Sequence, residues 1–171
     1  AAAGYVVFYN NYRGSLSYGE DFALVLQYKY SSVEDFADHM SGIDALIEKG
    51  FVDKDNLFIA GGSAGGIAAA YAVGLTDRFN AAVAAKPVIN WISKTLTADS
   101  MVGQIYHQFP GPPREHFEHY WKRSPLSLVG NVVTPTLLLT GEEDRRTPMS
   151  ETEQFYQALR LRGVDSAMVR L

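Results

Sequence analysis

Residues 57–70, LFIAGGSAGGIAAA, decide how this chain folds. The run begins with four apolar residues, as expected of a short buried strand, and residues 64–74 are small enough for a helix that packs closely on a sheet. Between them stands one serine, Ser63, flanked only by glycine and alanine. Residues 61–65 fit the pattern G-x-S-x-G, which presents a nucleophilic serine when it lies between a strand and a helix. We therefore predict a sharp strand-to-helix turn at Ser63.

The residues around this serine have expected roles of their own. In so tight a turn, we expect a side chain at Gly61 or Gly65 to collide with neighbouring backbone. The first amides of the following helix are aimed at the place where charge develops on an attacked carbonyl oxygen, so Ala64 N–H is the expected oxyanion donor. The alternative is a glycine-rich turn that only packs tightly or holds a phosphate. Residues 61–66 are not followed by the lysine of a Walker-type phosphate loop, and they lack the G-x-G-x-x-G spacing of a dinucleotide-binding motif.

Strands and helices alternate along the rest of the chain. Strands are predicted at residues 4–9, 57–60, 80–88, 134–141 and 166–171, and short helices and loops between Val88 and Gly130. This order predicts an α/β fold in which a mostly parallel sheet carries helices on both faces. The first and last strands begin and stop so abruptly that residues 1–171 are expected to be one partial domain, incomplete at both ends.

Two capping boxes mark the expected helix starts. Ser31 with Glu34 precedes a helix over residues 33–49 that Gly50 ends, and Ser150 with Glu153 precedes a helix that ends at Gly163.

Composition excludes several classes of function. A net charge of −4 without a basic run argues against a nucleic-acid partner. No apolar run approaches the roughly 18 residues of a membrane span. The absence of cysteine excludes disulfides and thiolate metal sites, and leaves the compartment open.

An acidic loop follows the predicted strand at 134–141. In hydrolases with the G-x-S-x-G turn, the acid of the triad follows the serine along the chain, and here Glu142, Glu143 and Asp144 all stand at a suitable place. Spacing alone does not choose among the three. A solvated loop with Arg145 and Arg146 as counter-charges is an equal alternative.

Together, these segments resemble the peptidase domain of the prolyl oligopeptidase family, most closely its acylaminoacyl-peptidase and dipeptidyl-peptidase branches. The shared motifs are Arg13-Gly14-Ser15 with Tyr18-Gly19, the nucleophile motif G-x-S-x-G-G at residues 61–66, and G-x-x-D-x-R-x-P at Gly141, Asp144, Arg146 and Pro148. The resemblance implies an α/β-hydrolase fold and a serine-type peptidase that acts on short peptides. Ser63 would be the nucleophile and Asp144 the acid, and no metal or organic cofactor is implied.

The resemblance also assigns substrate contacts. Arg146 matches an arginine that binds a substrate carbonyl in some members, and Val88 and Trp91 match a pocket for the side chain before the cleaved bond. A surface arginine paired with Glu142 or Glu143, and a tryptophan buried under a loop, are the alternatives.

Two family features are expected outside residues 1–171: an upstream segment that gives a second oxyanion donor, and the histidine that serves as base. His39 is expected to pack on a helix, and His107, His116 and His119 lie between the serine and the acid, against the usual order. The pair His116 and His119 is interpreted as a solvated helix face rather than a metal site. These residues alone are thus expected to be almost inactive, and an N-terminal propeller is the expected partner in the parent protein. A carboxylesterase and a non-catalytic binding domain on the same fold are the rival hypotheses.

Overall fold

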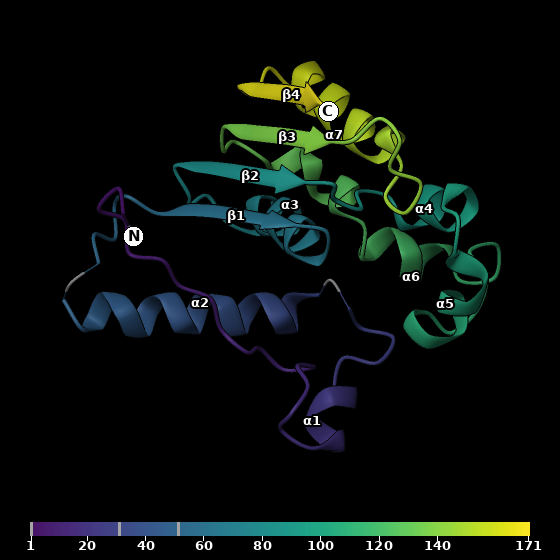
Figure 1. The fold of residues 1–171 in the computed structure, drawn as a ribbon, viewed down its shortest axis with the longest axis horizontal. Coiled ribbons are helices and arrows are strands. Elements are labelled where there is room, and N and C mark those ends of the chain that lie inside the picture. The colour runs from purple at the N-terminus through teal and green to yellow at the C-terminus, as the bar shows by residue number, and fades with distance from the viewer. Residues whose placement is uncertain (1, 31, 51) are drawn as a thin grey trace.

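A four-stranded parallel sheet forms the centre of the fold (Figure 1). The computed structural model describes residues 2–30, 32–50 and 52–171, with the side chains of residues 101–104 left aside. The strands are β1 (Phe58–Gly62), β2 (Ala81–Ala85), β3 (Thr136–Thr140) and β4 (Ser166–Arg170). They pair in parallel in the order β1-β2-β3-β4. The predicted α/β class and parallel sheet are confirmed.

Helices fill the connections between the strands. The long ones are α2 (Val33–Glu48) before β1, α3 (Ala64–Leu75) between β1 and β2, and α7 (Met149–Leu161) between β3 and β4. The connection from β2 to β3 contains α4 (Trp91–Thr97), α5 (Met101–Gln108), α6 (Phe117–Lys122) and the 3-10 helix η1 (Pro125–Asn131). A single turn, α1 (Glu20–Leu24), lies near the N-terminus. Short helices therefore occupy the expected region, and Figure 1 places α4, α5 and α6 beyond the carboxyl ends of the strands.

The long helices pack on one face of the sheet. Ala84 and Leu138 of the strands share a buried cluster with Val73 of α3 and Phe155 of α7. A second cluster joins α2 to the same helix α3 around the buried Ala72. None of the described helices is both long enough and apolar enough to cross a membrane.

The described helices cover one of the two faces on which helices were expected. Side chains alternate along the strands, so that Leu138 is fully buried while Phe58 and Val169 on the opposite face are 51% and 41% exposed. A right-handed connection between neighbouring parallel strands fixes the face on which its helix lies. Because the order β1-β2-β3-β4 never reverses direction, the connecting helices α3 and α7 fall on the same side.

The strand predicted at residues 4–9 is not formed. Tyr5, Val6, Val7 and Tyr9 are all more than half exposed, with 61%, 54%, 65% and 89% of their surface accessible. Side chains of the segment touch β1 and α2: the Tyr5 and Phe58 ring centroids are 5.9 Å apart, and the Phe8 ring lies beside Gly42. A β-branched and aromatic run becomes a strand where a neighbouring strand supplies hydrogen bonds, and none of the described strands pairs with this one.

Helix α2 starts close to its predicted position. The N–H and hydroxyl of Ser32 both donate to Asp35 Oδ1, at 2.8 Å each, and form the cap. The predicted pair involved Ser31, which lies outside the described residues. At the other end, Gly50 takes a φ of 79° and stops the helix as expected.

The second predicted capping box is wrong. Helix α7 begins at Met149 directly after Pro148, so Ser150 and Glu153 lie inside the helix and no side chain caps it. A proline is well suited to the start of a helix because its φ is already fixed and it has no N–H to satisfy. The predicted end is confirmed, because Gly163 has a φ of 73° and donates to Arg160.

Candidate active site

Ser63 forms the whole junction between β1 and α3. Its φ of 55° and ψ of −117° are unusual for a residue with a side chain. Two backbone hydrogen bonds hold it there: Ser63 N–H donates to Ala85 O at 2.9 Å, and Ser63 O accepts from Ile67 N–H at 3.0 Å. The predicted sharp turn is therefore present, with Ser63 at its apex.

The structure leaves no room for a side chain at Gly61 and Gly66, but it does at Gly65. A Cβ on Gly61 would lie 2.3 Å from Gly65 O, and one on Gly66 would lie 2.6 Å from Ala85 O. A Cβ on Gly65 would meet no atom within 4 Å. The prediction was right for Gly61 and wrong for Gly65, because it is the backbone of Gly65 that fills the space beside Gly61. Gly66 is the second position where close approach requires glycine.

The first amide of helix α3 belongs to Ala64. No intrahelical acceptor exists for the first N–H groups of a helix. Within the described part of the chain, no acceptor pairs with Ala64 N–H either. Because Ala64 directly follows the serine, its N–H can donate to an anionic oxygen bound beside Ser63.

Asp144 lies in the turn that follows β3. Its Oδ1 accepts from the N–H groups of Arg146 and Thr147, each at 2.9 Å, and its Oδ2 accepts from the Thr147 hydroxyl at 3.0 Å. Partial burial acts to raise the pKa of Asp144. The hydrogen bonds from Thr147 and Arg146 outweigh it, with a smaller effect of the Lys86 charge, so the pKa lies below its ordinary value. The side chain is therefore a fixed carboxylate at neutral pH.

Ser63 and Asp144 follow the carboxyl ends of two parallel strands, β1 and β3, with β2 between them. Neighbouring strands lie about 4.8 Å apart, so the two strand axes are roughly 10 Å apart. Both residues therefore lie at the same edge of the sheet, as predicted.

Arg146 has a different partner from the ones considered from sequence. Its Nε donates to Asp99 Oδ1 at 2.7 Å, whereas Glu142 lies 3.7 Å from Arg170. The guanidinium is exposed and sits on the loop that contains Asp144. A ligand oxygen that binds Arg146 must share it with Asp99.

Val88 and Trp91 lie just beyond the end of β2 and are almost completely buried. They pack with Ile67, Phe109 and Tyr120, and the Trp91 and Phe109 rings meet edge to face at 5.1 Å. Within the described residues Val88 and Trp91 are thus enclosed by neighbouring side chains, and their role in a substrate pocket stays a prediction. Phe109 and Tyr120 could not be assigned to this cluster from sequence, because both come from the irregular connection between β2 and β3.

In the part of the chain that the structure describes, none of the four histidines is hydrogen-bonded to Ser63 or Asp144. His39 shares a hydrogen bond of 2.7 Å with Asn10, and His119 accepts from Arg123 Nε at 2.9 Å. His116 precedes α6, and His107 lies in α5. The described residues contain no cluster of three or more side chains able to hold a metal ion.

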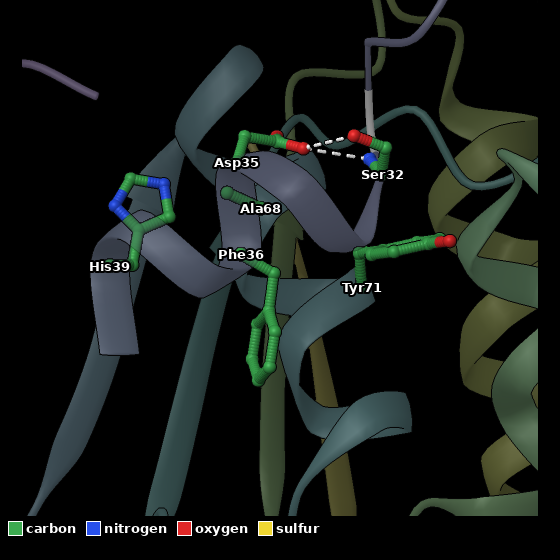
Figure 2. Close-up of a pocket in the computed structure, with 6 residues that line it drawn as sticks. All are labelled: Ser32, Asp35, Phe36, His39, Ala68 and Tyr71. Atoms are coloured by element: carbon green, nitrogen blue, oxygen red, sulfur yellow. Dashed lines mark hydrogen bonds between the residues drawn. The ribbon is translucent and has the colours of Figure 1, made fainter. Parts of the chain in front are cut away.

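Two cavities lie away from the serine. Figure 2 shows the smaller one, between α2 and α3, where Ser32 and Asp35 form one wall; its volume of about 10 Å³ is close to the minimum for one water molecule. The larger one, about 310 Å³, lies between the loop around α1 and helix α5. It includes Tyr30, whose ring lies 6.4 Å from that of Trp91. Neither cavity is lined by Ser63 or Asp144.

One further residue at this edge was missed from sequence. Glu151, in the first turn of α7, is fully buried and accepts hydrogen bonds from the segment that contains Val88 and Trp91. Its partners are far away in sequence, so no local pattern marks it.

Comparison with known sequences identifies close relatives. The chain is 38% identical to the uncharacterized peptidase YuxL of Bacillus subtilis over 173 residues, which cover 99% of this chain and 26% of that protein. It is 35% identical to the acylamino-acid-releasing enzyme of Arabidopsis thaliana, across 96% of this chain and 22% of the enzyme. The chain thus spans about a quarter of the length of these relatives.

Solved structures of acylaminoacyl peptidases have the same fold as this chain. The acylaminoacyl peptidase of Pyrococcus horikoshii superposes with a TM-score of 0.88 at 30% identity, over 94% of this chain and 26% of that one. The four parallel strands and their helices therefore form part of an α/β-hydrolase fold. The family described as the prolyl oligopeptidase family matches residues 1–171. The chain belongs to the prolyl oligopeptidase family.

Proposed function

We propose that Ser63 is the nucleophile of a serine peptidase and that Asp144 orients the histidine that takes its proton. One observation supports this above all: Ser63 stands at a φ of 55° between strand and helix, at the same sheet edge as a hydrogen-bonded carboxylate. The relatives carry peptidase and acylamino-acid-releasing names, which agree with this chemistry.

The proposed reaction follows the acyl-enzyme route. Ser63 Oγ attacks the carbonyl carbon of the peptide while the imidazole removes its proton, and Ala64 N–H donates to the oxyanion that forms. The carbon–nitrogen bond then breaks, and the imidazolium returns the proton to the leaving amine. Water, deprotonated by the same imidazole, hydrolyses the acyl ester and releases Ser63. This route uses no metal or organic cofactor.

We place the histidine outside residues 1–171. The four histidines of this chain have other neighbours or lie in the connection between β2 and β3, as described above. A serine without its base loses about a millionfold in turnover. The isolated residues 1–171 should therefore react very slowly.

The proposed substrates are short peptides, in line with the solved relative bound to Z-Gly-Gly-Phe-chloromethyl ketone. Val88 and Trp91 would form the wall of a pocket for the side chain before the cleaved bond, and Arg146 would bind a substrate carbonyl. Residues 1–171 would be part of one peptidase domain, whose partner in the complete polypeptide is an N-terminal propeller that limits substrate size.

Labelling with a fluorophosphonate probe tests this assignment. In the complete polypeptide that contains this chain, Ser63 should be labelled rapidly and stoichiometrically. Ser63→Ala should abolish the label, whereas Ser41→Ala, which removes an exposed hydroxyl on α2, should leave it unchanged.

Three outcomes would contradict the proposal. A complete polypeptide that takes no label is a non-catalytic domain. Cleavage of p-nitrophenyl esters without cleavage of aminoacyl or prolyl anilides identifies a carboxylesterase. Fast labelling of residues 1–171 alone shows that one of their own histidines is the base.

A further inference from the structure

Glu151 is a buried carboxylate that the proposed mechanism leaves unused. The side chain is fully buried in the first turn of α7, where the charged form of a carboxyl group is costly unless it is hydrogen-bonded. Burial raises the pKa of Glu151, and hydrogen bonds from Ser93, Asn90 and Ile89 act against this rise. Protein groups therefore offset part of the cost of burying this carboxylate.

These contacts come mainly from one short segment. Oε2 accepts from Ile89 N–H at 2.9 Å and from Asn90 N–H at 2.8 Å, and Oε1 accepts from the Ser93 hydroxyl. Gln154, one turn along α7, adds donors to Ser93 Oγ at 2.9 Å and to Oε1 at 3.4 Å. The carboxylate thus binds the backbone just before α4 and a side chain of its first turn.

The segment held in this way lies in the middle of the proposed pocket wall. Ile89 and Asn90 are the residues between Val88 and Trp91. On the other side, α7 begins directly after the turn in which Thr147 holds Asp144. Glu151 is thus a direct link between the pocket wall and the element that follows the acid.

We infer that Glu151 is a positioning residue, which fixes the segment from Val88 to Trp91 relative to the Asp144 turn and so sets the selectivity of the pocket. The inference rests on the proposed peptidase function and deepens it. Glu151 touches no reacting atom. It acts through the Ile89 and Asn90 amides, whose position determines where Val88 and Trp91 lie.

Two substitutions separate this role from general stabilisation. Glu151→Ala removes both acceptors and leaves the Ile89 and Asn90 amides without a partner, whereas Glu151→Gln keeps one oxygen for them. Glu153→Gln is the matched control: it removes a charge from the same helix, where Glu153 pairs at the surface with Arg170.

The readout is the ratio of kcat/KM for two anilides of the complete polypeptide, one with phenylalanine and one with alanine before the cleaved bond. Titration of active sites with the fluorophosphonate probe corrects each value for unfolded protein. We expect the ratio to fall about tenfold in Glu151→Ala, through a raised KM for the phenylalanine substrate, to recover largely in Glu151→Gln, and to stay unchanged in Glu153→Gln.

A ratio that stays constant in Glu151→Ala after this correction overturns the inference, because a purely structural role lowers both rates alike. Should Glu151→Ala fail to fold, Ser93→Ala removes one donor to the same carboxylate and must shift the ratio in the same direction; a constant ratio there also overturns it. Wild-type protein that accepts neither probe nor substrate overturns the proposed function itself, which is a different result.

Discussion

Alanine substitutions at Gly61, Gly65 and Gly66 give three different expected outcomes within one motif. At Gly61 the new Cβ would lie 2.3 Å from Gly65 O and 2.4 Å from Gly65 C, whereas ordinary contacts begin at 3.4 Å. The overlap is about 1 Å, and both opposing atoms are backbone that cannot rotate away. Overpacking of this kind costs about 1–3 kcal/mol, and a clash against backbone belongs at the upper end, near 3 kcal/mol.

Gly66→Ala should be nearly as damaging. Its Cβ would lie 2.6 Å from Ala85 O, and relief of that contact requires β2 to move away from the turn. Gly65→Ala should instead stabilise the fold by about 0.5 kcal/mol, since no atom lies within 4 Å of the new methyl group and alanine restricts the unfolded chain.

The assay is loss of fluorophosphonate labelling at Ser63 as urea is raised, measured on the complete polypeptide, so that the signal reports this domain alone. Gly61→Ala and Gly66→Ala should move the midpoint to lower urea, and Gly65→Ala should keep it or raise it. Equal midpoints for Gly61→Ala and Gly65→Ala would refute the reasoning from space around the turn.

Two further predictions concern the acid and its loop. Because the pKa of Asp144 is lowered on folding, its contribution to stability is present above the ordinary value of 3.8 and is lost as pH falls through the lower folded value. Asp144→Asn should therefore be less stable than wild type at pH 7, and the difference in urea midpoint should shrink as pH is lowered below 3.8; a difference that stays constant would contradict this. Asp99→Ala frees Arg146 from an exposed ion pair, so KM for a peptide anilide should fall by up to about fivefold, whereas an unchanged KM would mean that Arg146 does not bind substrate.

The turn at Ser63 could be predicted from sequence because its cause is local. A strand, a helix and the glycine at residue 61 all lie within a few residues of the serine, and close approach within this segment dictates the residue type. The choice of Asp144 over Glu142 and Glu143 came from the resemblance. The structure adds a physical distinction, since Asp144 accepts hydrogen bonds from its own turn while Glu142 lies near Arg170.

The features that could not be predicted from sequence depend on residues that are far away along the chain. Residues 5–9 have strand-like side chains but no adjacent strand among the described residues, and so remain extended and exposed. Glu151 resembles any surface acid in a first helical turn until Asn90 and Ser93, far away in sequence, are brought against it. Arg146 likewise pairs with Asp99, which is 47 residues away, so no short-range pattern indicates this partner.

The bond from Ser63 N–H to Ala85 O has a consequence for the order of folding. Parallel strands pair only after the helix between them has closed a long loop, which makes this pairing a late and non-local event. A nascent chain with α3 already formed but β2 not yet paired lacks the bond to Ala85 O, and only the bond from Ile67 N–H to Ser63 O holds the serine. The backbone geometry at Ser63 is thus complete only when β2 has joined the sheet.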